Sequence, residues 1–119
     1  MVLEKSDRPW GSYEVLHEAA THKVKTISVI PGKRLSYQRH QHRSEHWYIV
    51  YGTAEVVVND VSSILEAGST VTVQTGELHR IGNVGKVPML FIEVQTGTYF
   101  GEDDIERIQD DYGRDEEGK

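Results

Sequence analysis

Alternate residues of one polar stretch have side-chain types that bind metal ions. The segment Arg34–His42 predicts a strand, in which every second residue lies on the same face. One face then carries four polar side chains, Ser36, Gln38, His40 and His42. Such a set is costly in a plain barrel core because unpaired buried polar groups cost free energy, and a shared metal ion or a wet cavity would remove that cost. The next strand opens with Glu45, and a distant segment supplies His79 just after a turn at Gly76.

The rest of the sequence predicts the strands that must position these side chains. Its apolar residues come in short runs with a period of two, broken by Gly, Pro, Asn or Asp, and helix signals are scarce. This pattern is typical of an all-β sandwich or barrel. The predicted strands are Gly11–Leu16, His22–Ile30, Arg34–His42, Glu45–Val50, Ala54–Val58, Val61–Leu65, Ser69–Val73, His79–Asn83 and Pro88–Gln95.

The two ends of the chain differ in character from this middle part. We expect a single domain over residues 1–119, with an N-terminal arm at about 1–12 and an acidic strap at about 97–119. In the strap, Ile105, Ile108 and Tyr112 lie three to four residues apart, which predicts a short helix or an irregular segment over the barrel. The last residues, Arg114–Lys119, are expected to be disordered.

Composition limits the partners and the metal ligands. The net charge is −6 over 119 residues, which argues against nucleic acid or an anionic membrane as a partner. A phosphorylated ligand would therefore need a local basic pocket. The chain has no cysteine, so a metal site would need nitrogen and oxygen ligands. The sequence shows neither a secretory signal nor an apolar run of membrane length, so the expected location is the cytoplasm.

Two stretches resemble the two sequence motifs of the cupin family. From Gly32 the first stretch runs five residues, Gln38-x-His40, four residues, Glu45, six residues and Gly52. Gln38 stands where the family usually has its first His. The other spacings agree with the family pattern.

The second motif begins at Gly68. It continues with five residues, Gln74-x-Gly76, two residues, His79, three residues and Asn83, and it departs from the family only at Gln74, where a Pro is usual. The resemblance implies a single-domain cupin barrel, a double-stranded β-helix or jelly-roll fold. It also implies one divalent metal ion, of Zn, Mn, Co, Ni or Fe, with the ligands Gln38, His40, Glu45 and His79.

The ligand set with Gln in first place resembles the metal site of phosphomannose isomerases. Flanking segments are similar to the type II phosphomannose isomerase domain, which often forms the C-terminal part of a bifunctional guanylyltransferase. The segments are Arg8–Tyr13, Glu45–Trp47, His79–Ile81, Glu93–Gln95 and Gly101–Ile105. The nucleotidyltransferase domain is absent from this sequence, so we expect the isomerase-type cupin alone. The resemblance implies an aldose-ketose isomerase that interconverts mannose 6-phosphate and fructose 6-phosphate through an enediol.

Several residues are candidates for the chemistry that this reaction needs. Glu93, Lys25 and His42, in that order, are candidates for the base that removes the carbon-bound proton. Arg80 and Lys25 are candidates to hold the phosphate and to balance the enediolate charge. Plain structural interpretations stay open for Lys25 and Arg80, as solvent-facing strand charges. We expect His42 to lie beside the metal or to face the substrate, and its alternatives are a metal ligand or a plain structural residue. His42 could also pair with His40 as the usual His-x-His, although that pairing departs from the motif spacing.

Three further residues are candidates for substrate contacts. Ser36 shares a face with Gln38, and Gln95 shares a face with Glu93. Tyr99 begins the acidic strap, which either closes over the cavity or is a solvated acidic run. The expected partners are a small-molecule sugar phosphate and, because cupin barrels commonly dimerise, a second copy of the chain.

Two other classes of function stay open. One is a non-catalytic sugar-binding cupin, in which the metal orients a ligand without turnover. The other is a different metal-dependent cupin enzyme, such as a free-sugar isomerase or a dioxygenase, which Gln38 disfavours because ferrous dioxygenases more often keep a set of His and carboxylate. Iron loading with oxygen uptake would favour the dioxygenase. A phosphate-sized cluster of Arg and Lys at the barrel mouth would favour the isomerase.

Overall fold

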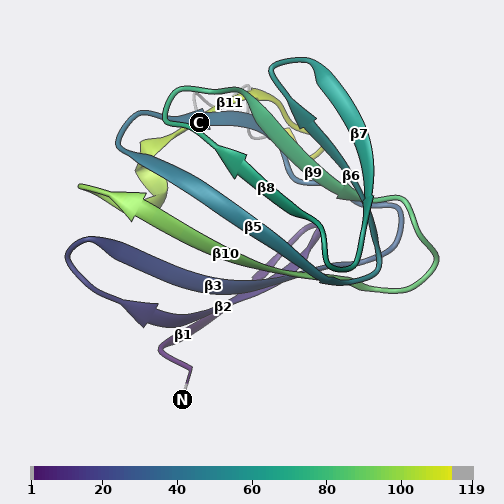
Figure 1. The fold of residues 1–119 in the computed structure, drawn as a ribbon, viewed down its shortest axis with the longest axis horizontal. Helices are drawn as coiled ribbons and strands as arrows, with labels where there is room; N and C mark the ends of the chain where they lie inside the picture. Colours follow the sequence, from purple (N-terminus) through teal and green to yellow (C-terminus); the bar gives the residue numbers. More distant parts are fainter. Residues whose placement is uncertain (1, 114–119) are drawn as a thin grey trace.

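Eleven strands and one 3₁₀ turn make up residues 2–113, the part of the chain that the computed structural model describes (Figure 1). The strands are β1 Glu4–Arg8, β2 Gly11–Glu18, β3 His22–Val29, β4 Tyr37–His40, β5 Arg43–Tyr51, β6 Thr53–Val58, β7 Val61–Glu66, β8 Thr70–Val73, β9 His79–Asn83, β10 Met89–Gly97 and β11 Ile105–Gln109. The expected all-β class is confirmed, since these residues form no α-helix. Nor does any helix in this range have the length and apolarity needed to cross a bilayer.

The strands form two antiparallel sheets, so that segments distant in sequence lie side by side (Figure 1). The first sheet has the strand order β1-β2-β3-β10-β5-β8, and the second has the order β11-β4-β9-β6-β7. In the first sheet, β10 lies between β3 and β5 and places Glu93 opposite Lys25. In the second sheet, β4 pairs with β9 and places Gln38 opposite His79. The two sequence motifs therefore meet inside one barrel.

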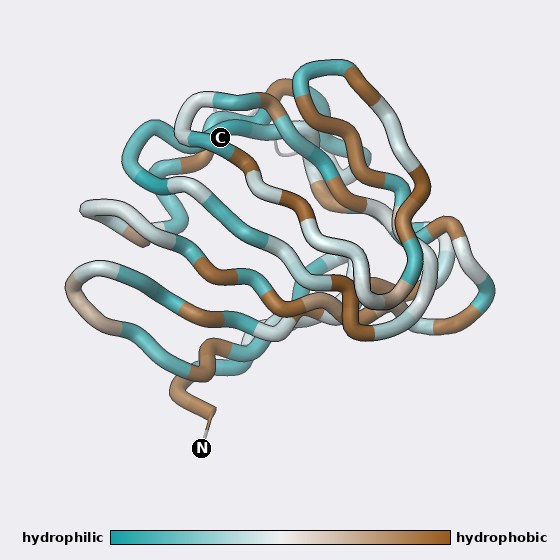
Figure 2. The backbone as a smooth tube through the Cα atoms, viewed as in Figure 1, coloured by the Kyte–Doolittle hydropathy of each residue, from teal (hydrophilic) through white to brown (hydrophobic). Residues whose placement is uncertain are grey.

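The interior of the barrel changes from apolar to polar along three neighbouring strands. Because side chains alternate across a strand, every second residue points inward. The inward residues of β10 are Met89, Phe91, Glu93 and Gln95. Those of β3 follow the same order, Val29, Ile27, Lys25 and Lys23. Those of β5 are Ile49, Trp47, Glu45 and Arg43. Figure 2 shows hydrophilic and hydrophobic residues alternating along these strands.

The apolar end of the interior is the hydrophobic core that holds the polar end in place. Trp47 and Phe91 are almost fully buried, and their ring centroids lie 5.6 Å apart. Gly52, the last glycine of the first motif, turns the chain from β5 into β6 at this end, with a φ of +95° that favours glycine. A Cβ at Gly52 would lie 2.8 Å from the Cα of Met89. The motif glycine therefore lets this turn pack closely against β10.

The nine strands predicted from the sequence correspond to β2–β10, but the two ends of the chain form strands that were not predicted. Glu4–Arg8 is the edge strand of the first sheet, and Ile105–Gln109 is the edge strand of the second. The expected helix or irregular segment of the strap is thus a 3₁₀ turn, Glu102–Asp104, followed by a strand. Pairing with the open edge of β4 outweighs the helical spacing, because Ile105 packs inward there. The disorder expected for Arg114–Lys119 concerns residues outside the described range.

Candidate metal centre and active site

Three ligand-type side chains meet at the polar end of the barrel, one from each of β4, β5 and β9. They are His40, Glu45 and His79, all buried, with one ligand atom of each within 4.8 Å of the others. His79 Nε2 lies 3.7 Å from Glu45 Oε1, and His40 Nδ1 lies 3.5 Å from Glu45 Oε2. Two imidazoles and a carboxylate are a ligand set that borderline divalent metals accept.

His79 presents Nε2, and not Nδ1, to the cluster. Its Nδ1 lies 2.9 Å from the carbonyl oxygen of Glu77, and since a carbonyl only accepts, Nδ1 carries a proton and donates it. In the neutral imidazole Nε2 is then the atom with the lone pair, and this atom is buried and has no hydrogen-bond partner. A buried acceptor without a partner costs free energy, and a cation at this position would satisfy it. This orphaned nitrogen is the observation on which the fit of a metal ion rests.

Arg43 contacts the other two members of the cluster. Its guanidinium donates from Nη2 to His40 Nε2 at 2.9 Å and from Nε to Glu45 Oε2 at 3.2 Å. Trp47 Nε1 donates to Glu45 Oε1 at 3.1 Å. The carboxylate is therefore fixed from two sides. The arginine also competes with a metal ion, because it places a positive charge on two of the lone pairs that an ion would use.

Burial and neighbouring charges set the protonation of the cluster. Burial lowers the pKa of His40 to about 4, so its imidazole is neutral at pH 7. Burial alone would raise the pKa of Glu45, but the positive charge that the two imidazoles carry when protonated, together with that of Arg43, outweighs burial and holds this pKa at about 2. A neutral imidazole and an ionised carboxylate are the forms that bind a cation.

Gln38, the predicted fourth ligand, lies on the inward face beside the cluster. Its Oε1 accepts a hydrogen bond from Ser36 Oγ at 2.5 Å, and Gln38 pairs with His79 across β4 and β9. Gln38, Ser36 and Glu45 line the same cavity. Coordination of a metal ion by the amide remains a prediction.

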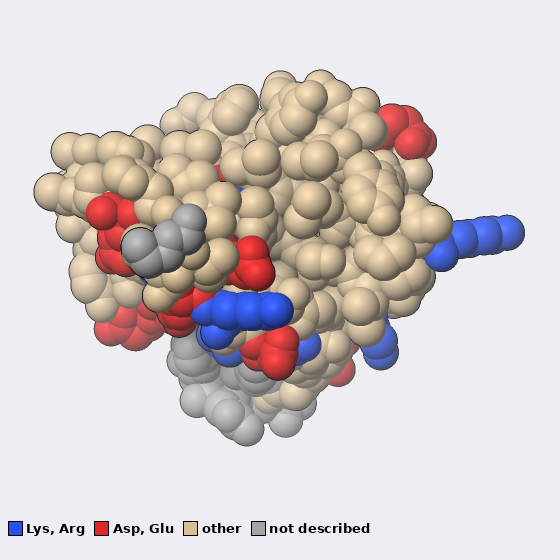
Figure 3. Space-filling view, turned by 90° about the horizontal axis from the view of Figure 1, so that it is seen from below, with Lys and Arg blue, Asp and Glu red and all other residues tan. Residues whose placement is uncertain are grey.

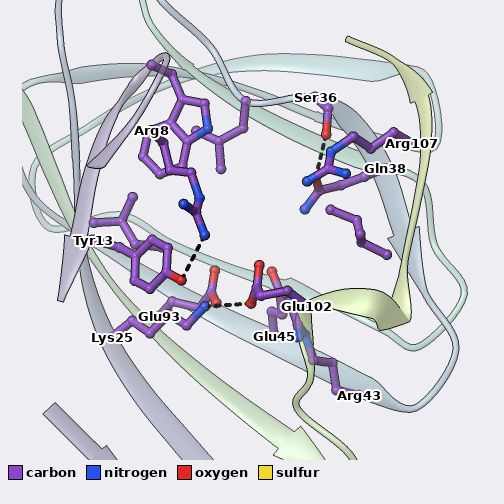
Figure 4. A pocket seen from close by; sticks show the side chains of 14 residues that line it. Arg8, Tyr13, Lys25, Ser36, Gln38, Arg43, Glu45, Glu93, Glu102 and Arg107 are labelled. Atoms are coloured by element: carbon purple, nitrogen blue, oxygen red, sulfur yellow. Dashed lines mark hydrogen bonds and ion pairs between the residues drawn. The ribbon is translucent and has the colours of Figure 1, made fainter. Parts of the chain in front are cut away.

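This cavity leads from the cluster to the surface, and its lining is rich in charge. Its open space, mouth included, is about 480 Å³. The cationic side chains that line it are Arg8, Lys25, Arg43 and Arg107. The acidic ones are Glu45, Glu93 and Glu102. In a chain of net charge −6 this lining carries an excess of positive charge, and Figure 4 shows these side chains converging on one open space.

Comparison with known proteins identifies the family of this chain. Residues 2–110 match the family described as "Mannose-6-phosphate isomerase C-terminal". The chain belongs to this family. The alginate biosynthesis protein AlgA of Pseudomonas aeruginosa is 49% identical over 107 residues, and the mannose-1-phosphate guanylyltransferase ManC of Salmonella typhimurium is 43% identical over 107 residues. Each match covers 90% of this chain and 22% of the relative, so the chain spans about a fifth of the length of these proteins.

Solved structures confirm the double-stranded β-helix fold expected from the cupin motifs. KdgF from Halomonas sp. superposes with a TM-score of 0.76 at 15% identity, over 84% of this chain and 89% of that protein. An uncharacterized protein with a double-stranded β-helix domain from Klebsiella pneumoniae superposes with a TM-score of 0.68 at 26% identity, over 74% of this chain and 77% of that protein.

In this member of the mannose-6-phosphate isomerase C-terminal family, Glu93 and Lys25 both face the cavity. Glu93 is 5% exposed, and burial, followed by the charge of Glu45, raises its pKa to about 7. Gln95, fully buried on the same face, donates from Nε2 to Glu93 Oε2. Lys25 Nζ donates to Glu102 Oε2 at 3.1 Å and lies 4.3 Å from the ring centroid of Tyr13. Of the two interpretations open for Lys25, the solvent-facing one is wrong.

Arg80 and His42 are not among the residues that line the cavity with Lys25. Arg80 is buried and lines a smaller pocket together with Glu93 and His79, while its guanidinium donates to the backbone carbonyls of Leu35 and Gln109. The side chain of His42 is 57% exposed and its Nδ1 lies 2.9 Å from Asp104 Oδ1. The expected inward direction of His42 is wrong, because β4 ends at His40 and the turn after it breaks the alternation.

Tyr99 is exposed, and its hydroxyl donates to Asp103 in the segment that precedes β11. It is not among the residues that line the cavity, whereas Ser36 is. The strap reaches the cavity through Glu102, Ile105 and Arg107 instead.

Sequence reasoning missed several charged residues of the cavity. Arg8 and Arg107 come from the two edge strands that were not predicted, and Arg43 precedes the motif glutamate on β5. Arg43 had a detectable signal, since it shares the inward face of a strand with Glu45 two residues later. Arg8 was noted only as part of a resembling segment. Arg107 lies in an acidic run whose composition indicates solvent exposure.

Proposed function

We propose that this chain is a metal-dependent aldose-ketose isomerase that interconverts mannose 6-phosphate and fructose 6-phosphate through an enediol. The observation that carries the proposal is the position of Glu93, a buried carboxyl that lines the same cavity as Glu45 of the metal cluster and whose pKa, in the metal-free protein, is raised to about 7. A carboxyl whose pKa is near the working pH can both accept a proton from carbon and return it. Membership of the mannose-6-phosphate isomerase C-terminal family supports the same reaction.

One divalent ion, of Zn, Mn, Co, Ni or Fe, would be held by His40, Glu45 and His79, with Gln38 as the fourth ligand. When bound, such an ion supplies a Lewis acid that polarises the sugar carbonyl and balances negative charge on its oxygen. The lone pair of His79 Nε2 is already available for it. Arg43 would have to release His40, since its guanidinium contacts that imidazole.

Glu93 would remove the proton next to the carbonyl and return it to the neighbouring carbon. The hydrogen bond from Gln95 fixes the orientation of this carboxyl, and the apolar environment near Trp47 and Phe91 keeps it protonatable near neutral pH. Lys25 carries the positive charge nearest to Glu93 in the sheet and would balance the enediolate. His42, the third candidate base, is less suited because it is exposed and paired with Asp104.

A coupled assay tests this function. The protein would be stripped of metal, reloaded separately with Zn²⁺, Mn²⁺, Co²⁺ and Ni²⁺, and followed for consumption of mannose 6-phosphate. We expect turnover with at least one metal, and its loss in His79→Ala. His46→Ala is the matched control, since His46 is exposed on β5 and contacts Thr72. Metal binding by the wild-type protein without turnover would refute the isomerase and support the sugar-binding cupin.

We also propose that two copies of the chain form a homodimer through the outer face of the first sheet. The proposed location of the protein is the cytoplasm. The outward residues of the four strands β3, β10, β5 and β8 include Thr26, Ser28, Leu90, Ile92, Val94, Tyr48, Val50, Thr70 and Thr72. None of these side chains is charged, whereas Figure 3 shows Lys, Arg, Asp and Glu side chains side by side on the face of the molecule seen from below. Two copies of an acidic chain repel unless they meet through an uncharged surface.

Light scattering on the purified protein tests the dimer. We expect twice the mass of one chain, and the mass of one chain for Ile92→Glu, whose side chain would bring two carboxylates into the interface. Thr96→Glu, at the far end of the same strand, is the control. A wild-type mass of one chain at all concentrations tested would refute the dimer.

A further inference from the structure

A carboxyl group of the strap reaches the cavity that the proposed reaction would use. Glu102 begins the 3₁₀ turn Glu102–Asp104 between β10 and β11, and it lines the cavity together with Glu45 and Glu93. Its Oε2 accepts a hydrogen bond from Lys25 Nζ at 3.1 Å, while Oε1 takes no part in this bond. The side chain of Glu102 is 45% exposed. A ligand in the cavity can therefore reach this carboxylate.

The turn that carries Glu102 is fixed to the chain just after β4. Asp104, two residues after Glu102, accepts hydrogen bonds from the backbone N–H of Gln41 at 3.1 Å and of His42 at 3.0 Å. Glu102 is thus held on one side by the backbone contacts of its own turn and on the other side by Lys25 of the first sheet. Its carboxylate keeps its position without help from a ligand.

Lys25 interacts with two carboxyl groups whose protonation differs. Glu93 lies opposite Lys25 across β10 and β3, and Figure 4 shows Lys25 beside Glu93 with its contact to Glu102 as a dashed line. Burial raises the pKa of Glu93 to about 7. Burial alone would raise the pKa of Glu102 as well, but the charges of Lys25 and Arg43 outweigh it and lower this pKa. Two carboxyl groups whose pKa values are moved apart can take different parts in one reaction.

The proposed isomerisation moves two protons, and Glu93 accounts for only one of them. The proton on C2 of the sugar goes to C1, and the hydroxyl proton on O2 goes to O1. Glu45 is unsuited to the second transfer, because it accepts hydrogen bonds from Trp47 and Arg43 within the metal cluster. Glu102 remains, and an ionised carboxylate can accept a hydroxyl proton and return it.

We propose that Glu102 is a second catalytic residue, which transfers the hydroxyl proton from O2 to O1 while Glu93 transfers the proton from C2 to C1. This assignment rests on the proposed function. Glu93 removes the C2 proton, the electron pair of that bond forms the C1–C2 double bond, and the carbonyl pair moves to O1. Glu102 accepts the proton of O2 and gives it to O1. The pair left on O2 forms the new carbonyl at C2 as C1 takes the proton from Glu93. Both carboxylates end as they began, and no other reactant is consumed.

Deuterium exchange separates the two proton transfers. The metal-loaded protein would be mixed with mannose 6-phosphate in D₂O, and NMR at low conversion would give two rates, entry of deuterium at C2 and formation of fructose 6-phosphate. Glu102→Gln should slow the formation of fructose 6-phosphate by about 10²- to 10⁴-fold, the usual contribution of an acid-base group. Its exchange at C2 should stay within about 10-fold of the wild-type rate, because Glu93 is still present and the ion pair of a half-exposed carboxylate contributes little.

Asp103→Asn is the matched control, because Asp103 is the next residue of the same turn, accepts a hydrogen bond from Tyr99 and is not among the residues that line the cavity. Both of its rates should equal those of the wild type. Glu102→Asp, which keeps the carboxylate, should recover part of the conversion. Glu102→Gln overturns the proposal if its conversion is unchanged, or if exchange and conversion fall together, as a merely structural role would require. A wild-type protein with neither exchange nor conversion overturns the isomerase itself, and the role of Glu102 with it.

Discussion

Replacing Glu93 by Gln should make the metal-free protein more stable at alkaline pH. Burial, and then the charge of Glu45, raises the pKa of Glu93 from 4.5 to about 7. A carboxyl with a higher pKa in the folded chain binds more protons there than in the unfolded chain, so the free energy of unfolding falls as the pH rises from 4.5 to 7. The difference between these two pKa values corresponds to about 3 kcal/mol lost above pH 7.

A glutamine at this position is neutral at every pH, so its presence does not lower the free energy of unfolding as the pH rises. The substituted glutamine would keep the size of the side chain, and Lys25 would keep Glu102 as a partner at 3.1 Å. We therefore expect Glu93→Gln to raise the free energy of unfolding by roughly 1–3 kcal/mol at pH 8 and by less than about 1 kcal/mol at pH 5. The same variant should lose isomerase activity, because an amide cannot accept the proton.

Urea unfolding followed by tryptophan fluorescence measures this difference. The protein should be treated with a chelator, because a bound cation would itself lower the pKa of a nearby carboxyl. Glu18→Gln, at an exposed position of β2, is the control and should show no change between the two pH values. Equal effects of Glu93→Gln at pH 5 and pH 8, or a variant less stable than the wild type at pH 8, would refute the reasoning.

Three further predictions concern the site and its scaffold. His79→Ala should weaken Zn²⁺ binding at least 10-fold in calorimetry, because it removes the orphaned Nε2, whereas unchanged affinity would exclude His79 as a ligand. Arg43→Gln should tighten Zn²⁺ binding, because it removes a positive charge from His40 Nε2 and Glu45 Oε2, and weaker binding would show that the arginine supports the site instead. Gly52→Ala should lower the free energy of unfolding by about 2 kcal/mol or more in urea, since its φ is +95° and its Cβ would meet Met89, and an unchanged midpoint would contradict this packing.

The strands and the metal cluster could be predicted because both rest on local regularities. Alternation within a strand puts Gln38 and His40 on one face, and the structure has them both inward on β4. The meeting of His79 with Glu45 is a long-range contact that no local pattern contains. The prediction of this contact came from the resemblance of two motifs. The order of strands in the two sheets explains how the two segments come together.

The edge strands could not be predicted, and the cavity residues they carry were missed with them. Strand β1 consists of polar residues only, Glu4–Arg8, so it lacks the alternation that marks a strand. Its pairing with β2 supplies the backbone hydrogen bonds that fix its structure. In the same way Arg107 lies in an acidic run, and only the pairing of β11 with β4 turns it toward the cavity. A run of charged residues like this one indicates a solvent-exposed segment as long as the pairing of the strands is not known.

Isomerisation in D₂O tests the central claim most directly. The metal-loaded protein would be mixed with mannose 6-phosphate, and proton NMR would follow the signal of the hydrogen at C2. We predict conversion to fructose 6-phosphate with entry of deuterium at C2 of the recovered mannose 6-phosphate, and neither event in Glu93→Gln with its metal still bound. Conversion that persists in Glu93→Gln would contradict the role of this carboxyl, and a metal-loaded wild-type protein that leaves the sugar unchanged would contradict the isomerase.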